Sequence, residues 1–366
     1  MRRLAAGALA NLFLASIAAA ATFVVRPGDS IQAAVDRAPA GSHILVRPGV
    51  YHESGAVRAV TVTRDHIHLI GLARPNRPVI IEQSGTQTQG IWVSPPDTLE
   101  PANVELPPCG VSGERIQGSD VRGFTVQGFA RFGIYLACVD SFSVRQNVAR
   151  DDRTYSIFPV RSSRGRLTGN RGSGTHSDAC IYVGQDEDVL VDHNRATDCL
   201  IGLQIENCQR VTMRDNEAVG NTAGIIVDVI DQRQTKVAAD NRLIRNLIAD
   251  NNRPNDAPPD EDTSLIPPGI GLIVNGATRT LITRNTIRNH GLAGMTLEDF
   301  CLGMRAACAD PTLDIDPNPN DNRVIANRFD GDAVDVIYLP GKGTGNCFAR
   351  NRPARLTGGP LPACPH

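Results

Sequence analysis

The chain has 366 residues, of which 37 are Lys or Arg and 39 are Asp or Glu, so its formal net charge is −2. This balance excludes the basic surplus typical of nucleic-acid-binding proteins, and 41% hydrophobic residues supply enough apolar material for a large core. Only 4% of the residues are aromatic, whereas 34 are Gly and 24 are Pro, which favours many short strands and tight turns over helices.

The first 21 residues have the pattern of a secretory signal peptide. Arg2 and Arg3 precede a largely apolar run from Leu4 to Ala21, in which Ala19, Ala20 and Ala21 suit signal cleavage. No later segment has the roughly 18 uninterrupted apolar residues that span a membrane. We therefore expect a periplasmic or secreted mature chain, residues 22–366, that has no membrane contact after cleavage.

The segment that follows predicts a short capping helix. Ser30 can serve as the N-cap of a helix over Ile31 to Ala38, in which Ile31, Ala34 and Val35 fall on one face. A helix in this position would close the N-terminal end of a stack of strands.

A short strand motif then recurs along the chain. Its copies begin at Gly133, Ser156, Cys180, Gly202, Gly224, Gly271 and Gly294, and apart from one longer interval the starts are 22 to 24 residues apart. In five copies an Asn follows the start by 14 residues: Asn147, Asn170, Asn194, Asn216 and Asn285. The repeat predicts a single all-β domain, a parallel β-helix with about 23 residues per turn and an Asn at a tight bend.

Four segments exceed the repeat length and are expected to leave the coil as loops. They lie near residues 95–108, 229–240, 252–268 and 300–322, and residues 352–366 are expected to cover the last turn. Long loops on a rigid scaffold often form walls or lids of functional sites.

All nine cysteines follow the signal, which in an oxidising compartment predicts disulfides with one thiol left over. The pairs that we expect are Cys301 with Cys308, Cys347 with Cys364, and Cys109 with Cys138. The pairing within the set Cys180, Cys199 and Cys208 stays open. The cysteine spacings fit no zinc site.

Two groups of motifs resemble known proteins. The segments Val25 to Val35 and Ile44 to Glu53 resemble the opening of many exported right-handed β-helix proteins, among them pectin-active enzymes and periplasmic copper-accessory proteins. The segments Ser177 to Gln185, Gly202 to Asn207 and Asn221 to Ile225 are similar to a bacterial family of exported β-helix repeat proteins with a pectin-lyase-like fold.

The resemblance covers nearly all of the mature chain, although Cys180 stands where Gly is usual and Gln204 where Glu is usual. It implies a right-handed β-helix with three strands per turn, the recurring strand being the first. It also implies a saccharide groove on the outward face of that strand, between the flanking loops.

Stacking allows outward-facing columns to be read from the sequence. Two residues after each start, the column is Tyr135, Phe158, Tyr182, Gln204, Ile226, Ile273 and Thr296; four residues after, it is Ala137, Val160, Gly184, Glu206, Asp228, Asn275 and Glu298. Glu206 and Asp228 are expected on adjacent turns about 5 Å apart, where like charges raise one pKa. This pair is a catalytic candidate, and two solvated carboxylates are the alternative interpretation.

Further candidates come from the same strands and from the turns before them. The candidate substrate-binding residues are Tyr182, Gln185, Gln204, Asn275 and Glu298. The aromatic column either stacks on sugar rings or is covered by a neighbouring loop. Asp178, His176 and Arg153 are the other catalytic candidates, since His176 and Asp198 could form a base with its orienting group and Arg153 could neutralise a uronate carboxylate.

One loop has an oxygen spacing that suggests calcium. Asp314, Asp316 and Asn318 are the candidate ligands, but Pro319 replaces the glycine of an EF-hand loop and Ile325 stands where Glu belongs. Calcium is therefore the one cofactor that we consider, and no other is expected.

The leading hypothesis is an exported, monomeric protein that binds or acts on an acidic polysaccharide or a cell-surface glycan. Lyase, epimerase and glycosidase reactions all stay open. A lyase would use Arg153 and His176, whereas a glycosidase would use Glu206 and Asp228, with retention of configuration. A non-catalytic module that presents its face to a glycan or a protein is the alternative. Copper handling ranks last, because the chain has only four Met and no His/Met cluster.

Overall fold

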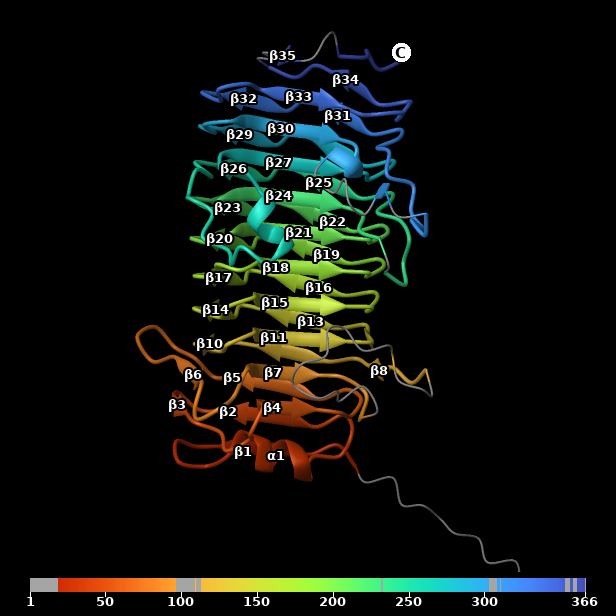
Figure 1. Cartoon of the computed structure of the whole chain (residues 1–366). Coiled ribbons are helices and arrows are strands. Elements are labelled where there is room, and N and C mark those ends of the chain that lie inside the picture. The colour runs from red at the N-terminus through yellow and green to blue at the C-terminus, as the bar shows by residue number, and fades with distance from the viewer. Residues whose placement is uncertain are drawn as a thin grey trace, which may run out of the picture.

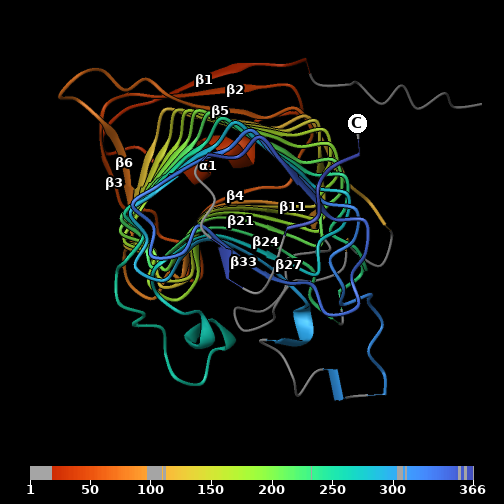
Figure 2. The same ribbon diagram turned by 90° about the horizontal axis from the view of Figure 1, so that it is seen from above.

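The structure, a computed structural model, describes residues 19–96, 109, 113–231, 233–302, 308–309, 311–352, 356–357 and 361–365. Most of the predicted signal peptide and most of the insertion near 95–108 lie outside these residues. The described chain coils into a parallel β-helix, in which three sheets run the length of the molecule (Figure 1). Seen along the axis, the turns superimpose around a common core (Figure 2).

Each full turn contributes one strand to each sheet, and every pairing between the strands of these sheets is parallel. Sheet 1 contains β4 (Arg58–Val62), β7 (Gln89–Val93), β11 (Phe132–Ala137), β15 (Tyr155–Val160), β18 (Ala179–Gly184), β21 (Ile201–Glu206), β24 (Ala223–Asp228), β27 (Ile270–Asn275), β30 (Ala293–Glu298), β33 (Val336–Leu339) and β35 (Leu356–Thr357). These strands include every copy of the recurring motif, so the motif is the first strand of each turn.

Sheets 2 and 3 follow in each turn. Sheet 2 contains β1 (Thr22–Val25), β2 (His43–Val46), β5 (His68–Gly71), β9 (Asp120–Arg122), β13 (Ser143–Arg145), β16 (Arg166–Thr168), β19 (Leu190–Asp192), β22 (Thr212–Arg214), β25 (Arg242–Ile244), β28 (Leu281–Thr283), β31 (Arg323–Ile325) and β34 (Cys347–Ala349). Sheet 3 contains β3 (Gly49–Tyr51), β6 (Val79–Glu82), β10 (Thr125–Gln127), β14 (Val148–Arg150), β17 (Arg171–Ser173), β20 (Arg195–Thr197), β23 (Glu217–Val219), β26 (Leu247–Ala249), β29 (Thr286–Arg288) and β32 (Arg328–Asp330). The short strands β8 (Ile116–Gln117) and β12 (Val139–Asp140) pair with each other.

The core is the interior of the coil. The alternate residues of sheet 1 that were predicted to point inward, such as Ile134, Leu136 and Ile181, are fully buried together with their counterparts on the next turns. Burying these side chains is the main driving force for the stacking of turns. The predicted inward pattern is confirmed.

A ladder of buried asparagines joins the turns at the bend between sheets 2 and 3. Its members are Asn147, Asn170, Asn194, Asn216, Asn246, Asn285, Asn327 and Asn351, and each side-chain amide donates to the side-chain oxygen of the next member. The same oxygen also accepts the backbone N–H of the preceding member, as Asn194 does for Asn170 at 2.9 Å. The five asparagines predicted from the repeat all belong to this ladder.

Both ends of the coil are closed. At the N-terminal end lies α1 (Ile31–Arg37), which is capped by Ser30 and buries Ile31, Ala34 and Val35 as predicted. Glu53 reinforces the cap, because its carboxylate accepts from the Ser30 hydroxyl and from the backbone of Ile31. At the C-terminal end, β35 pairs with β33, and a disulfide joins Cys347 to Cys364.

Four disulfides are present, and the three predicted pairs are among them: Cys109–Cys138, Cys301–Cys308 and Cys347–Cys364. The fourth, Cys180–Cys199, settles the open set and leaves Cys208 as a buried free thiol. No helix within the described ranges has the length and apolar character needed to cross a membrane.

Replacing Asn194 with Ala should destabilise the protein strongly. The substitution removes the side-chain acceptor of the Asn170 backbone N–H and of one N–H of the Asn170 amide, and it removes the side-chain donor to the Leu167 carbonyl. We expect a loss of about 3–5 kcal/mol in the free energy of unfolding, measured by urea denaturation. As a control, replacement of the neighbouring Arg195, which forms an exposed ion pair with Glu217, should cost less than about 1 kcal/mol. Equal losses in the two variants would contradict a stabilising role for the ladder.

Candidate functional site

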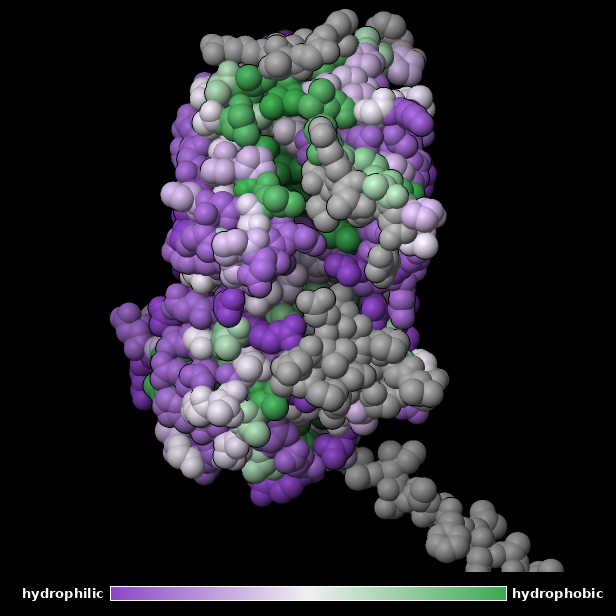
Figure 3. All heavy atoms as spheres, in the orientation of Figure 1, coloured by the Kyte–Doolittle hydropathy of each residue, from purple (hydrophilic) through white to green (hydrophobic). Residues whose placement is uncertain are grey.

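A groove of about 720 Å³ lies on the outward face of sheet 1. Its floor follows one predicted column from the aromatic side chains of Phe158 and Tyr182, past Gln204, to Ile226 and Ile273. Figure 3, drawn in the orientation of Figure 1, shows apolar side chains gathered in the hollow of the upper half of this face. The groove therefore combines an apolar part of the floor with a polar part that carries the candidate catalytic residues.

Insertions form the walls. Residues 252–268 contain the short helix η2 (Asp262–Leu265) and project over sheet 1 (Figures 1 and 2). The Thr263 hydroxyl donates to the Ser177 carbonyl at 2.8 Å, and Ile266 packs against the hydrophobic cluster on the outer face of sheet 1. On another side, η3 (Phe300–Leu302) supplies Phe300, and the loop after β24 supplies Arg233.

Glu206 and Asp228 stand side by side at the ends of β21 and β24, as their column predicted. Both are nearly buried, with 3% and 8% of their surface exposed. Arg233 forms an ion pair with Glu206 at 2.9 Å, whereas Asp228 accepts two hydrogen bonds from the Gln204 amide at 3.1 and 3.3 Å. Burial, and after it the neighbouring Glu206 charge, raises the pKa of Asp228 well above its usual value. The two carboxyls thus differ in environment, one facing a cation and the other an amide.

Asp178 lies at the opposite end of the strands, immediately before β18. The Tyr155 hydroxyl donates to it at 2.6 Å, and burial raises its pKa to about 8. Glu298, at the end of β30, also lines the groove, and burial raises its pKa to about 7. Near neutral pH the groove therefore holds several carboxyls that retain protons.

The other candidates divide between the groove and its surroundings. Arg153, Tyr182, Gln204 and Asn275 line the groove, and Arg153 is 3.6 Å from the Glu261 carboxylate of the 252–268 insertion. Gln185 is not among the lining residues, and its side-chain oxygen accepts the backbone N–H of Gln234 in the loop after β24. Tyr135, Phe158 and Tyr182 form a buried aromatic cluster, so the column is packed rather than open to solvent.

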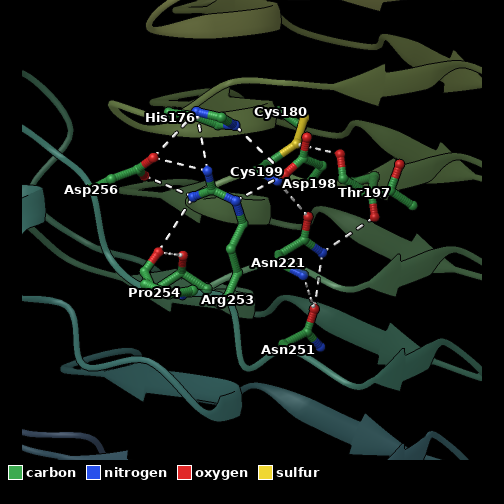
Figure 4. A network of polar contacts seen from close by, with 12 residues as sticks. His176, Cys180, Thr197, Asp198, Cys199, Asn221, Asn251, Arg253, Pro254 and Asp256 are labelled. Atoms are coloured by element: carbon green, nitrogen blue, oxygen red, sulfur yellow. Dashed lines mark hydrogen bonds and ion pairs between the residues drawn. A yellow bond between two sulfur atoms is a disulfide. The ribbon is translucent and has the colours of Figure 1, made fainter.

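His176 also lies outside the groove lining, in the polar network of Figure 4. The predicted contact with Asp198 is present at 3.6 Å, but the insertion completes the network: Arg253 donates to Asp198 at 2.8 Å and contacts the His176 ring at 3.2 Å. Arg253 is further paired with Asp256, which also lies 3.4 Å from His176. These contacts anchor the start of the 252–268 insertion to the turns of the coil.

The calcium candidates have protein partners. Asp314 forms an ion pair with Lys236, and the Asp316 carboxylate accepts from Asn318 and Asn320. Within the described ranges, no group of three or more His, Cys, Asp or Glu side chains is arranged to hold a metal ion.

Arg233, Glu261 and Tyr155 are groove residues that were not identified from the sequence. Arg233 and Glu261 belong to insertions that lack the repeat, so no neighbouring turn indicates where they lie. Tyr155 could have been found, because it is one residue before a strand start, next to Phe132 on the preceding turn. Stacking of the turns therefore places Tyr155 at the beginning of the sheet 1 strands, where its hydroxyl reaches Asp178.

Several proteins of solved structure have the same fold and are named as enzymes that act on polysaccharides. The Azotobacter vinelandii mannuronan C-5 epimerase AlgE6 A-module has a TM-score of 0.63 at 15% sequence identity, covering 92% of this chain and 93% of that one. An alginate lyase from Paenibacillus sp. str. FPU-7 has a TM-score of 0.51 at 10% identity, covering 94% and 99%. The pectate lyase Pel9A has a TM-score of 0.50 at 12% identity, covering 93% and 78%. At these identities the likeness establishes the fold alone.

The sequence matches the protein family described as periplasmic copper-binding protein (NosD) over residues 72–263 and 122–352. No curated protein sequence matches it. Copper sites use His, Cys and Met ligands. In the described part of the chain, however, Met213 and Met295 are fully buried in the coil, Cys208 is buried, and no metal-binding cluster is present. These residues do not fit a copper centre.

The buried carboxyls make stability depend on pH. Asp178 and Glu298 have folded-state pKa values of about 8 and 7, above the ordinary 3.8 and 4.5, so the folded state binds protons more tightly than the unfolded state. Their stabilising contribution is complete below about pH 4 and is lost as the pH rises through about 7 to 8. We expect the melting temperature to fall across this range, and the fall to be smaller in Asp178→Asn. An unchanged slope in that variant would contradict the assignment.

Proposed function

The chain belongs to the NosD family of right-handed parallel β-helix proteins, and we propose that it is an exported protein that takes a polysaccharide in the groove on sheet 1 and hydrolyses it. The periplasmic description of the family and the four disulfides support export, because disulfides persist in oxidising compartments. The groove supports a polymeric ligand, since its floor extends across consecutive turns of the coil.

The observation that carries the proposal is the pair formed by Glu206 and Asp228. Adjacent strands of a sheet are about 4.8 Å apart, close to the carboxyl separation of about 5 Å in glycosidases that retain configuration. Asp228, whose pKa is raised, donates its proton to the glycosidic oxygen as the bond to the leaving sugar breaks. Glu206 attacks the anomeric carbon, and water then releases the glycosyl group while Asp228 takes back a proton.

The groove also supports a second candidate, lyase or epimerase chemistry on a uronate. Arg153 lines the groove with 62% of its side chain exposed, so it is available to a sugar carboxylate. Both reactions need such a cation to stabilise the charge that develops when a proton is removed next to the carboxylate. A module that binds glycan without turnover is the remaining alternative.

Hydrolysis should be lost when either carboxyl is removed. We expect the mature protein, assayed with and without calcium on pectic, alginate and neutral polysaccharides, to release new reducing ends without unsaturated uronides. Glu206→Gln and Asp228→Asn should lower the rate by about 10²-fold or more, because each removes one partner of the acid and nucleophile pair.

The matched control is Glu217→Gln, which removes an exposed carboxylate from sheet 3 and should leave the rate unchanged. Detection of unsaturated product would contradict hydrolysis and would indicate a lyase reaction. No product in either assay from folded protein would favour an epimerase or a binding module.

Binding of acidic glycans should weaken as the pH rises. Three arginines and seven carboxylic acids line the groove, and Asp178, Asp228 and Glu298 have raised pKa values. Their deprotonation adds negative charge that repels uronates but not neutral sugars. Titration calorimetry with Glu206→Gln at pH 6 and pH 9 should show a large loss of affinity for a galacturonate oligomer and little change for a neutral oligomer. Equal changes for the two ligands would contradict this electrostatic account.

A further inference from the structure

A second hollow, of about 490 Å³, lies on the outward face of sheet 2 near the N-terminal end of the coil. Its floor is a column of paired residues on four successive strands, His43 on β2, His68 on β5, Asp120 on β9 and Ser143 on β13. Figure 2 shows that β2 and β5 lie on a different side of the coil from β21 and β24, which carry the groove on sheet 1. The hollow is therefore separate from the proposed glycan site.

Positive charge exceeds negative charge in this hollow. Asp120 is its single carboxylate and contacts two guanidinium groups, those of Arg145 at 3.2 Å and Arg122 at 3.5 Å. The side chains of these arginines remain 41% and 34% exposed, so they keep N–H donors directed to solvent. A guanidinium carries five such donors, which one shared carboxylate does not satisfy.

The histidines do not suit a metal ion. The rings of His43 and His68 are stacked, with centroids 4.4 Å apart and planes 15° from parallel. A metal ion lies near the plane of each imidazole that binds it, and two nearly parallel planes at this separation cannot share one ion. The rings instead offer N–H groups along the rim of the hollow, and burial together with the neighbouring His43 lowers the pKa of His68.

We propose that this hollow binds a small oxyanion with the chemistry of a carboxylate, sulfate or phosphate group. Arg122 and Arg145 supply charge-assisted donors from the floor of the hollow. Such a site would hold either an acidic sugar of a glycan or an inorganic anion. The two ligands can be distinguished by affinity, because only an acidic sugar gains further contacts from its ring.

The test follows the imidazole C–H signals of the protein by nuclear magnetic resonance during titration with inorganic phosphate, sulfate and galacturonate. Single His→Gln variants assign the signals of His43, His66 and His68, which all line the hollow. We expect saturable shifts of these three signals, and none with chloride at equal ionic strength. An anion that binds only in the groove on sheet 1 would leave these signals unmoved and would overturn the proposal.

Two variants measure the donors. Arg145→Gln should weaken oxyanion binding about tenfold, which corresponds to the loss of a charge-assisted hydrogen bond. Arg122→Gln keeps the ion pair of Arg145 with Asp120, so it should keep the melting temperature while weakening binding severalfold. The matched control is Arg242→Gln, an exposed arginine four turns further along the same column of sheet 2, which should change nothing.

Unaltered affinity in Arg122→Gln and Arg145→Gln would overturn the assignment even if an anion binds elsewhere. Tighter binding of galacturonate than of phosphate would identify an acidic sugar as the ligand, and the reverse order would identify a phosphate or sulfate group.

Discussion

The structure depends on one constraint: polar groups at the inner bends of the coil have no water and must find partners on the neighbouring turns. The ladder that includes Asn194 meets this constraint, because each amide donates upward and each side-chain oxygen accepts from the turn below. A slip of one residue in any turn would break these bonds and also turn the inward apolar side chains toward solvent. Register is therefore fixed throughout, and residues at equivalent positions become neighbours in space. Both the groove on sheet 1 and the hollow on sheet 2 are built from such columns.

The regular part of the fold could be predicted from the sequence because its signal repeats. The strand starts and the 14-residue offset to Asn predicted the turn length, the ladder and the pairing of Glu206 with Asp228. In the insertions, where the repeat is absent, the contacts of individual side chains could not be predicted. Arg233 and Arg253 belong to insertions, and nothing in their local sequence indicates that one meets Glu206 and the other Asp198. The pairing of Cys180 with Cys199 was not predicted either, because Cys199 and Cys208 lie on either side of the next strand of sheet 1, β21, and the repeat does not distinguish between them.

The groove shows how an insertion changes the chemistry of a regular column. On the coil alone, Glu206 and Asp228 would be two carboxylates on a strand surface without a neighbouring cation from an insertion. The loop after β24 adds Arg233 to one of them, and the 252–268 insertion helps to enclose the space around both. Their environments then differ, which is the condition for separate acid and nucleophile roles. The coil tolerates these additions because extra residues leave it at bends, where no strand pairing is interrupted.

The closed ends carry a further consequence. A stack of parallel strands presents unpaired N–H and C=O groups at each terminus, and another copy of the same coil is a suitable partner for them. Here the last turn is covered by β35 and by the segment that the Cys347–Cys364 disulfide holds in place. In a reducing compartment the segment held by this disulfide would be free to detach. The exposed strand edges of two coils would then pair, and coils would assemble end to end into fibres. The oxidising compartment would thus preserve the solubility of the protein as well as its fold.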